Sequence, residues 1–334
     1  MKKAYIQLVE TFVPQNVLNN HDLSIEFNIP EEEVFNQTGI NTRYHTSDKE
    51  LASDLAVSVG EKFFKENPLV NKNEINFLLF CTSALDYVGP ATACLIHEQL
   101  GLNKSCLAID VPMGCAGFTN GLILAKALIE NETAKKILFI TSDMPSKVVH
   151  PKDYHLRSLF SDAAAATLIS NEKGFEIGQF AFGTDGSGAP NLIIKGSGAR
   201  NPIDEDWLVK YKEVGGLKIG RMEMNGLEIL KFSLREIPHL FSDVLEKNKL
   251  TKSDIDYFIF HQASGIIIKY ITKKLDIDSN KVLSSLADYG NTVSASIPIA
   301  LSVAEKQNLI QPNSTIFIAG FGIGYSWSAT IIKN

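Results

Sequence analysis

Short apolar runs alternate along this chain with longer segments whose apolar positions recur at helical spacing. The apolar runs, such as residues 77–81 and 137–141, are bounded by turn-forming residues, which is typical of buried strands. The longer segments predict helices at residues 48–66, 91–100, 116–131, 227–247, 265–275 and 294–307. This alternation predicts an α/β protein in which strands pair in parallel and helices cover the sheets on both sides.

The chain also repeats itself after roughly 180 residues. The segment EINFLLFCTS at 74–83 resembles DIDYFIFHQA at 254–263, Gly114-Cys115 matches Gly290-Asn291, and ILFIT at 137–141 matches TIFIA at 315–319. Buried strands resemble one another in composition, but three matches in the same order favour a duplication. We therefore expect two halves, residues 1–176 and 177–334. A stretch rich in Gly, Asp, Pro and Lys at 183–221 predicts a surface excursion near the site.

Composition and charge exclude several classes of protein. The 334 residues are 45% hydrophobic and 21% charged, as in an ordinary soluble enzyme. A net charge of −6 argues against a nucleic-acid partner. No apolar run reaches the roughly 18 residues that a membrane span requires, and the first residues resemble a strand more than a signal peptide. The four cysteines form no metal-ligand or CxxC spacing, so we expect free thiols, a cytoplasmic protein and no metal site.

The segment MGCAGF at 113–118 holds the strongest candidate for chemistry. A predicted strand at 106–111 leads into Pro112 and Gly114, Cys115 follows, and a helix of small and apolar residues then begins. A cysteine at a helix N-terminus is stabilised as thiolate by the helix dipole, and the neighbouring glycines leave the sulfur approachable. Buried cysteines are commonly inert, which we expect for Cys81, Cys94 and Cys106. For Cys115 the turn favours a nucleophile.

The duplication supplies two partners for this cysteine. Asn291 occupies the helix start in the second half that Cys115 occupies in the first. His261 ends the strand that matches the strand ending at Cys81. If the halves pack about a pseudo-twofold axis, the thiol, imidazole and amide meet at one central site. The ordinary alternatives are a core histidine that is hydrogen-bonded and an asparagine that only forms a turn.

The chain resembles thiolase-fold condensing enzymes of the 3-oxoacyl-[acyl-carrier-protein] synthase III group over nearly its whole length. The resemblance rests on TGI at 38–40 with Arg43, GCAGF at 114–118, MNG at 224–226 with KF at 231–232, FHQA at 260–263, GNT at 290–292 with SIP at 296–298, and GFGIGYSW at 320–327. It implies a thiolase-like α/β fold of two duplicated halves. Each half would hold a mixed five-stranded sheet, in the layer order α-β-α-β-α.

The resemblance also implies a reaction. Cys115 would attack an acyl thioester and hold the acyl group covalently, and a malonyl thioester would then lose carbon dioxide. His261, as a neutral donor, and Asn291 would stabilise the enolate that remains. The backbone N–H groups of Cys115 and Gly324 would form the oxyanion hole of the following Claisen condensation. This reaction belongs to fatty acid biosynthesis or to a specialised lipid or polyketide pathway.

Substrates and partners follow from the same resemblance. Coenzyme A or acyl-carrier-protein thioesters would be substrates, with no bound cofactor, and the protein would form a homodimer. By position, the residues lining the substrate pocket would be Tyr87, Val88, Phe160 and Ile323. An acidic carrier protein would dock on Lys231, Lys273 and Lys274, although lysines at such positions are also common on solvated helices.

Four positions depart from the family pattern. Glu33 and Gln37 stand where members that use acyl-coenzyme A have a tryptophan and an arginine that sandwich adenine. Ile266 replaces a basic residue expected in carrier-protein docking, and SDA at 161–163 replaces a Gly-Asp-Gly. These differences lead to the hypothesis of a specialised acyl donor.

Two other functions remain open on the sequence alone. An acyltransferase of the same fold could use Cys115 to pass its acyl group to oxygen or nitrogen, without forming a carbon–carbon bond. A non-catalytic subunit could shape the pocket of a dimer partner. The presence of Cys115, His261 and Asn291 together favours the condensing enzyme.

Overall fold

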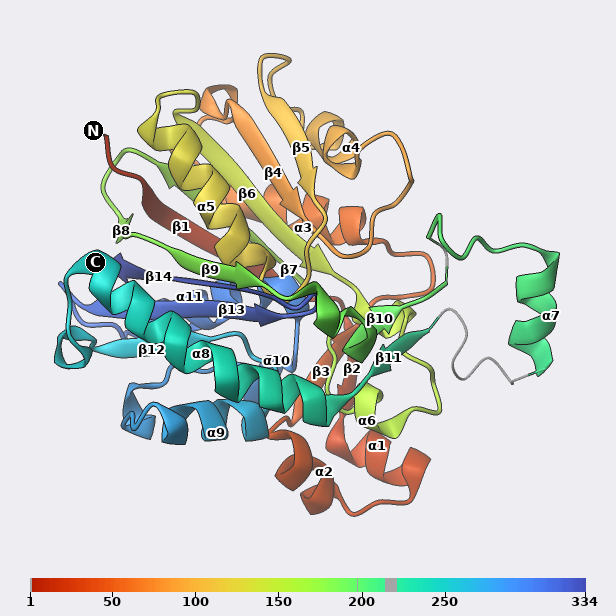
Figure 1. Cartoon of the computed structure of the whole chain (residues 1–334). Coiled ribbons are helices and arrows are strands. Elements are labelled where there is room, and N and C mark those ends of the chain that lie inside the picture. Colours follow the sequence, from red (N-terminus) through yellow and green to blue (C-terminus); the bar gives the residue numbers. More distant parts are fainter. Residues whose placement is uncertain (1, 197, 214–220) are drawn as a thin grey trace.

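The computed structural model describes residues 2–196, 198–213 and 221–334 (Figure 1). Parts of the expected excursion at 183–221, namely residue 197 and residues 214–220, lie outside the described residues. In the described part of the excursion, a short strand at 192–194 pairs with one at 222–224, just after the excursion, and the helix α7 (Glu205–Glu213) extends away from the sheets. The excursion therefore does lie beside the main body of the fold.

The first half of the chain builds a five-stranded mixed array in the order β5-β4-β6-β7-β1. Strand β4 pairs in parallel with β5 and β6, and β7 is antiparallel to β6 and β1. Every residue of β4 and β7 is buried, because helices cover both faces. These strands are β1 (Tyr5–Phe12), β4 (Phe77–Cys81), β5 (Leu107–Val111), β6 (Lys136–Asp143) and β7 (Ala163–Ser170).

The second half repeats this pairing pattern. Strand β12 is parallel to β13, β13 is antiparallel to β14, and β14 pairs antiparallel with β9. Phe258 on β12 also forms an isolated parallel bridge with Val282. This bridge beside β12 corresponds to the pairing of β5 beside β4 in the first half. These strands are β9 (Ala181–Thr184), β12 (Tyr257–Phe260), β13 (Thr315–Gly322) and β14 (Ser326–Lys333).

The two arrays join into one ten-stranded sheet. The short strand β8 (Phe175–Ile177) pairs with β1 of the first half and with β14 of the second. The expected boundary between residues 176 and 177 therefore falls inside a strand that both halves share. Sequence periodicity shows separate strands, but it does not show which of them continue a sheet across such a boundary.

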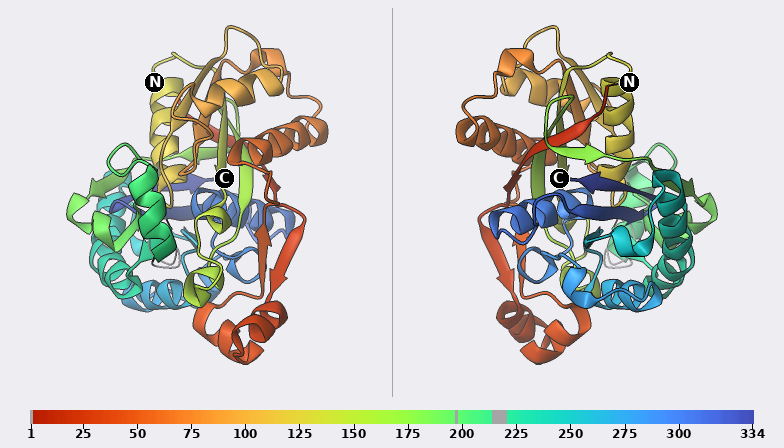
Figure 2. Two further views of the ribbon diagram at one scale, coloured as in Figure 1. Left: turned by 90° about the vertical axis from the view of Figure 1, so that its right-hand side faces the viewer. Right: turned by 90° about the vertical axis from the view of Figure 1, so that its left-hand side faces the viewer.

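Helices form three layers around these strands (Figures 1 and 2). Helices α3 and α4 cover the outer face of the first half, and α8 and α9 cover that of the second. Helices α5 and α11 lie between the halves and contact strands of both. The layer order is therefore α-β-α-β-α, as the thiolase-like fold requires. The helices are α3 (Ala52–Glu66), α4 (Thr92–Gln99), α5 (Gly117–Glu130), α8 (Gly226–Asn248), α9 (Gly265–Lys274) and α11 (Ser296–Lys306).

Small residues bring the central helix α5 close to the strands. A Cβ added at Gly121 would lie 2.2 Å from the ring of Phe139 on β6, and one added at Gly117 would lie 2.3 Å from Cys81 Sγ. Such distances are far inside van der Waals contact, so only glycine permits this approach. The small-residue pattern after Cys115 thus fixes the depth at which the start of α5 lies in the core.

The expected helices are all present, with differences at their ends. The helix expected from residue 48 begins at Ala52, where the Asp54 carboxylate accepts the Leu51 N–H at 2.8 Å and caps the first turn. The helix expected from residue 294 is preceded by a 3₁₀ turn, η6 (Val293–Ala295). Among the described residues, no helix has both the length and the apolar character needed to cross a membrane.

Smaller elements surround the mouth of the site. They are β2 (Asn16–Asn19), β3 (Thr42–His45), β10 (Leu192–Ile194) and β11 (Met222–Met224), with the helices α1 (Asn20–Phe27), α2 (Glu31–Thr38), α6 (Tyr154–Arg157) and α10 (Leu286–Tyr289). Buried Arg43 on β3 ties this region together, because its guanidinium donates to the Ser158 carbonyl at 2.6 and 2.9 Å.

Candidate active site

Three separate chain segments bring Cys115, His261 and Asn291 to one cavity of about 210 Å³. Cys115 comes immediately before the first turn of α5, His261 directly follows β12, and Asn291 follows the end of α10 at Gly290. All three side chains are almost completely buried. Cys115, His261 and Asn291, which the internal repeat of the sequence relates to one another, therefore lie together in the structure.

Burial dominates the acid–base state of Cys115. Removal from water raises the pKa of its thiol to about 11, and the negative charge of Asp143 adds to the rise. The N–H of Ile323 and the N–H of Cys115 itself act in the opposite direction. The helix N-terminus favours the thiolate, as expected, but in the resting site the desolvation cost exceeds the stabilisation by the helix end. The resting nucleophile is a neutral thiol.

Gly322, at the end of β13, lies directly behind the sulfur. A Cβ at this position would come within 2.6 Å of Cys115 Cβ and 2.8 Å of Cys115 Sγ. The backbone of β13 must therefore be bare here for the thiol to keep its position. This contact joins a strand of the second half to the nucleophile of the first.

His261 is held as a neutral ring. Its Nδ1 lies 2.7 Å from Ser296 Oγ, and burial lowers its pKa to about 3. Ser296 Oγ also accepts the N–H of Gln262 at 3.4 Å, so this serine ties the ring to the backbone beside it. Because the serine occupies Nδ1, Nε2 is the nitrogen left for the cavity, where it donates when it carries the ring proton.

Asn291 is held in one amide orientation. Its Oδ1 accepts the Val293 N–H at 3.0 Å, and its Nδ2 donates to the Ala263 carbonyl at 3.2 Å. An amide nitrogen carries two hydrogens, so one remains for a ligand in the cavity. The site thus offers two neutral donors, one from His261 and one from Asn291, which is an arrangement suited to an oxyanion.

The backbone donor opposite the sulfur is Ile323. The sequence leads to Gly324 as the partner of Cys115 in an oxyanion hole, and the N–H that lowers the pKa of the resting thiol belongs to Ile323, one residue earlier. The glycine-rich run GFGIG gives no local signal for this difference. The choice depends on how β13 turns beyond Gly322, which only the tertiary structure shows.

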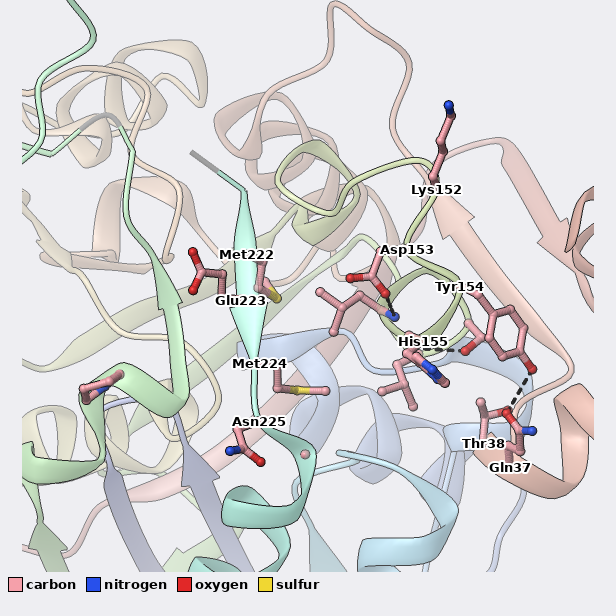
Figure 3. Close-up of a pocket in the computed structure, with 15 residues that line it drawn as sticks. Gln37, Thr38, Lys152, Asp153, Tyr154, His155, Met222, Glu223, Met224 and Asn225 are labelled. Carbon is pink, nitrogen blue, oxygen red and sulfur yellow. Dashed lines mark hydrogen bonds between the residues drawn. The ribbon is translucent and has the colours of Figure 1, made fainter. Parts of the chain in front are cut away.

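The cavity at Cys115 continues in two directions. On one side lies a small apolar pocket of about 40 Å³, whose lining includes Cys115, Val293, Phe160 and Ile323. On the other side lies an open cavity of about 920 Å³, which shares Gln37, Leu159, Met224 and Gly226 with the central one. Figure 3 shows this outer cavity, with Met222, Met224 and Asn225 on one wall and Gln37, Thr38 and Tyr154 across from them.

The predicted pocket residues divide into two pairs. Phe160 and Ile323 line the small pocket, as expected from their positions. Tyr87 and Val88 line none of the cavities around Cys115, and their exposed fractions are 60% and 107%. Within a single chain, these two residues therefore lie on an exposed loop and do not reach the cavities around Cys115.

The lysines that are predicted to dock a carrier protein lie on the helices α8 and α9. Lys231 on α8 pairs with Glu228 at 2.7 Å, while Lys273 and Lys274 are exposed in the last turn of α9. Ile266, on the first turn of α9, lines the central cavity and is 42% exposed.

Polar contacts fix the residues at 33, 37 and 162. Gln37 donates from Nε2 to Glu33 at 2.8 Å and accepts from the Tyr154 hydroxyl at 3.1 Å (Figure 3). Asp162, in the SDA sequence, accepts hydrogen bonds from the backbone and hydroxyl groups of Thr46 and Ser146. Among the described residues, no group of three His, Cys, Asp or Glu side chains could hold a metal ion.

Comparisons with known proteins show the family to which the sequence is similar. Two family models match the chain: 3-oxoacyl-[acyl-carrier-protein (ACP)] synthase III over residues 109–186, and the C-terminal part of the same family over residues 245–334. The chain is 34% identical to the β-ketoacyl-[acyl-carrier-protein] synthase III of Clostridium tetani, covering 100% of this chain and 99% of that protein. It is 32% identical to the enzyme of that name from Campylobacter curvus, covering 100% and 97%.

Solved structures give the same result. A 3-oxoacyl-(acyl-carrier-protein) synthase III matches with a TM-score of 0.94 and 35% identity, over 99% of this chain and 100% of that one. A 3-oxoacyl-(acyl-carrier protein) synthase from Burkholderia xenovorans matches with a TM-score of 0.90 and 31% identity, over 99% and 94%.

Proposed function

Because this chain belongs to the β-ketoacyl-[acyl-carrier-protein] synthase III family of thiolase-fold acyltransferases, we propose specific roles for its residues in decarboxylative condensation. Cys115 carries the acyl group, and His261 and Asn291 stabilise the enolate of a malonyl thioester. The observation that supports this assignment is the convergence of a thiol, a neutral imidazole and an oriented amide on one cavity.

In the first half-reaction Cys115 displaces the thiol of the acyl donor. The new bond joins Sγ to the acyl carbon, the donor's carbon–sulfur bond breaks, and the Cys115 proton leaves on the released thiol. The backbone N–H groups of Cys115 and Ile323 act on the sulfur, which supports them as the donors that hold the oxyanion of the tetrahedral intermediate. We therefore propose Ile323 as the second backbone donor instead of Gly324.

In the second half-reaction a malonyl thioester loses carbon dioxide. The electron pair of the broken carbon–carbon bond moves onto the thioester as an enolate. His261 Nε2–H and the free Asn291 N–H then donate to its oxygen. The enolate carbon attacks the acyl group and Cys115 leaves as a thiolate that takes up a proton. A transfer of the acyl group to oxygen or nitrogen would give this pair of donors no enolate to stabilise.

The pocket volumes favour a short acyl group. A space of about 40 Å³ lies beside Cys115, with Phe160 and Ile323 in its wall. A single water needs roughly 10–15 Å³ of such space, so this pocket holds only a few heavy atoms. The 920 Å³ outer cavity has the size and position for the arm of the thioester that enters from the surface.

The carrier surface is proposed on α8 and α9. Helices α8 and α9 pack together, and both begin at the central cavity, where Asn225 and Ser264 cap their first turns. Lys231, Lys273 and Lys274 add positive charge along these helices, which suits an acidic carrier protein. Gln37 and Tyr154 line the outer cavity, and Gln37 contacts Glu33, so none of the three provides a guanidinium for a coenzyme A adenine. We therefore propose the carrier protein as the preferred donor.

A homodimer is proposed through the edge strand β5. This strand has β4 on one side and no paired strand on the other among the described residues, and Leu107 at its start is 56% exposed. An open apolar edge of this kind is suited to pairing with a second copy. The four free thiols fit a reducing compartment, and we propose a cytoplasmic location on that ground.

Mass spectrometry with a panel of acyl donors tests the assignment. We expect a mass increase on Cys115 with short acyl groups from acyl-carrier protein, a smaller increase with acetyl-coenzyme A, and little with long chains. In Asn291→Ala the acyl adduct should still form, while carbon dioxide release from malonyl-acyl-carrier protein should fall on the order of 10²- to 10³-fold.

Each of these measurements has a result that would contradict the proposal. Absence of any adduct on Cys115 would exclude the acyl-enzyme and favour a non-catalytic subunit. Efficient priming by acetyl-coenzyme A would exclude the carrier-protein preference. Undiminished carbon dioxide release in Asn291→Ala would remove this residue from the reaction.

A further inference from the structure

A fully buried carboxylate lies behind the site, outside the set of residues assigned above. Asp143 is the last residue of β6, and its side chain is inaccessible to solvent. No basic side chain is among its recorded hydrogen-bond partners in the described part of the chain. Burying a carboxylate without such compensation is costly, so its four hydrogen bonds call for an explanation.

The four hydrogen bonds come from two serines, one in each half of the chain. Oδ1 accepts the N–H of Ser83 at 2.8 Å and its hydroxyl at 2.6 Å. Oδ2 accepts the N–H of Ser294 at 3.1 Å and also the Ser294 hydroxyl. Each carboxylate oxygen therefore holds one serine by both its backbone and its side chain.

Both serines belong to segments that form the reaction site. Ser83 follows β4 and lines the small pocket beside Cys115. Ser294 lies in η6 next to Val293, whose N–H fixes the amide of Asn291. The carboxylate thus joins the pocket wall at the nucleophile to the turn that orients Asn291.

We propose that Asp143 is a positioning residue, which sets the Asn291 amide against the acyl group on Cys115 by clamping Ser83 to Ser294. The proposal rests on the roles given above to Cys115 and Asn291. A carboxylate suits this task, because all of its lone pairs accept and each oxygen can bind an N–H and an O–H together. An amide at this position would turn one donor toward a backbone N–H and release one serine.

The charge of Asp143 gives a second, independent readout. Burial raises the pKa of Asp143 to about 6, so the group is an anion at neutral pH. That anion raises the pKa of Cys115. Its removal should lower the pKa of Cys115, and alkylation of this cysteine by iodoacetamide should then begin at lower pH.

The variants Asp143→Asn and Ser294→Ala test the clamp in separate measurements of the two half-reactions. Acylation is followed as the adduct on Cys115, and decarboxylation as carbon dioxide released from malonyl-acyl-carrier protein. We expect decarboxylation to fall on the order of 10- to 100-fold in both variants, with acylation changed less than about threefold. Ser294→Ala removes a single hydroxyl, so it tests the clamp even if Asp143→Asn does not fold.

Asp110→Asn is the matched control. Asp110 on β5 accepts the N–H groups of Thr92 and Ala93 at 2.8 and 2.7 Å and caps α4, and it lines none of the cavities around Cys115. This variant should leave both half-reactions unchanged. Equal losses in both half-reactions of Asp143→Asn and Ser294→Ala, or no loss in either, would overturn the proposal. A wild-type protein that forms no adduct on Cys115 would instead overturn the proposed function.

Discussion

The buried imidazole of His261 makes the stability of this protein depend on pH in a calculable way. Burial lowers its pKa to about 3, against 6.5 for an exposed histidine. Between these two values the unfolded chain binds a proton at this residue and the folded chain does not. Falling pH therefore favours unfolding, and the stability present above pH 6.5 is lost progressively toward pH 3.

The size of the effect follows from the two pKa values. Proton linkage with 6.5 in the unfolded state and about 3 in the folded state gives a loss of about 2 kcal/mol between pH 7 and pH 5. Asp143 works in the opposite direction, because burial raises its pKa to about 6, and the folded state then holds a proton that the unfolded state has lost. A comparison with a variant that lacks only the imidazole separates the two contributions.

The variant is His261→Gln, and the measurement is urea unfolding at pH 7 and pH 5 at one protein concentration. The wild-type protein should lose about 2 kcal/mol more than His261→Gln between these pH values, since every other titrating group is common to both. His239→Gln, on the exposed side of α8, controls for the loss of an imidazole as such. If wild type and His261→Gln lose equal stability, His261 is not a buried neutral ring and the reasoning fails.

Two further substitutions test the packing at the nucleophile and the proposed dimer edge. Gly322→Ala should reduce acylation on the order of 10²-fold, because the added Cβ would lie 2.8 Å from Cys115 Sγ. Gly186→Ala is the control and should leave acylation unchanged, because no heavy atom lies within 4 Å of its added Cβ. Equal adduct formation in the two variants would refute this account. Leu107→Asp should convert a dimer into a 36.8 kDa monomer in analytical ultracentrifugation, whereas Leu69→Asp, at a 98% exposed position, should leave the dimer intact. A dimer that survives Leu107→Asp would place the interface elsewhere.

Much of the fold could be predicted from local pattern. Buried strands such as β4 and β13 are apolar and bounded by turns, and α5 shows its small-residue face in the sequence. The internal repeat relates Cys115 to Asn291 from residue spacing alone. By contrast, β8 is only three residues long, and its pairing with both halves follows from the packing of β1 and β14.

The sequence by itself determined the alternation of elements, the duplication, and which thiol, imidazole and amide could act together, because these depend on spacing and residue type. The tertiary structure decided the environment of each group. It placed Cys115 where burial outweighs the helix end, set the N–H of Ile323 to act on the resting thiol, and left Tyr87 in solvent. It also brought Asp143 between two serines more than 200 residues apart in the chain. Such outcomes depend on desolvation and on distances between remote segments, and neither quantity is encoded in local periodicity.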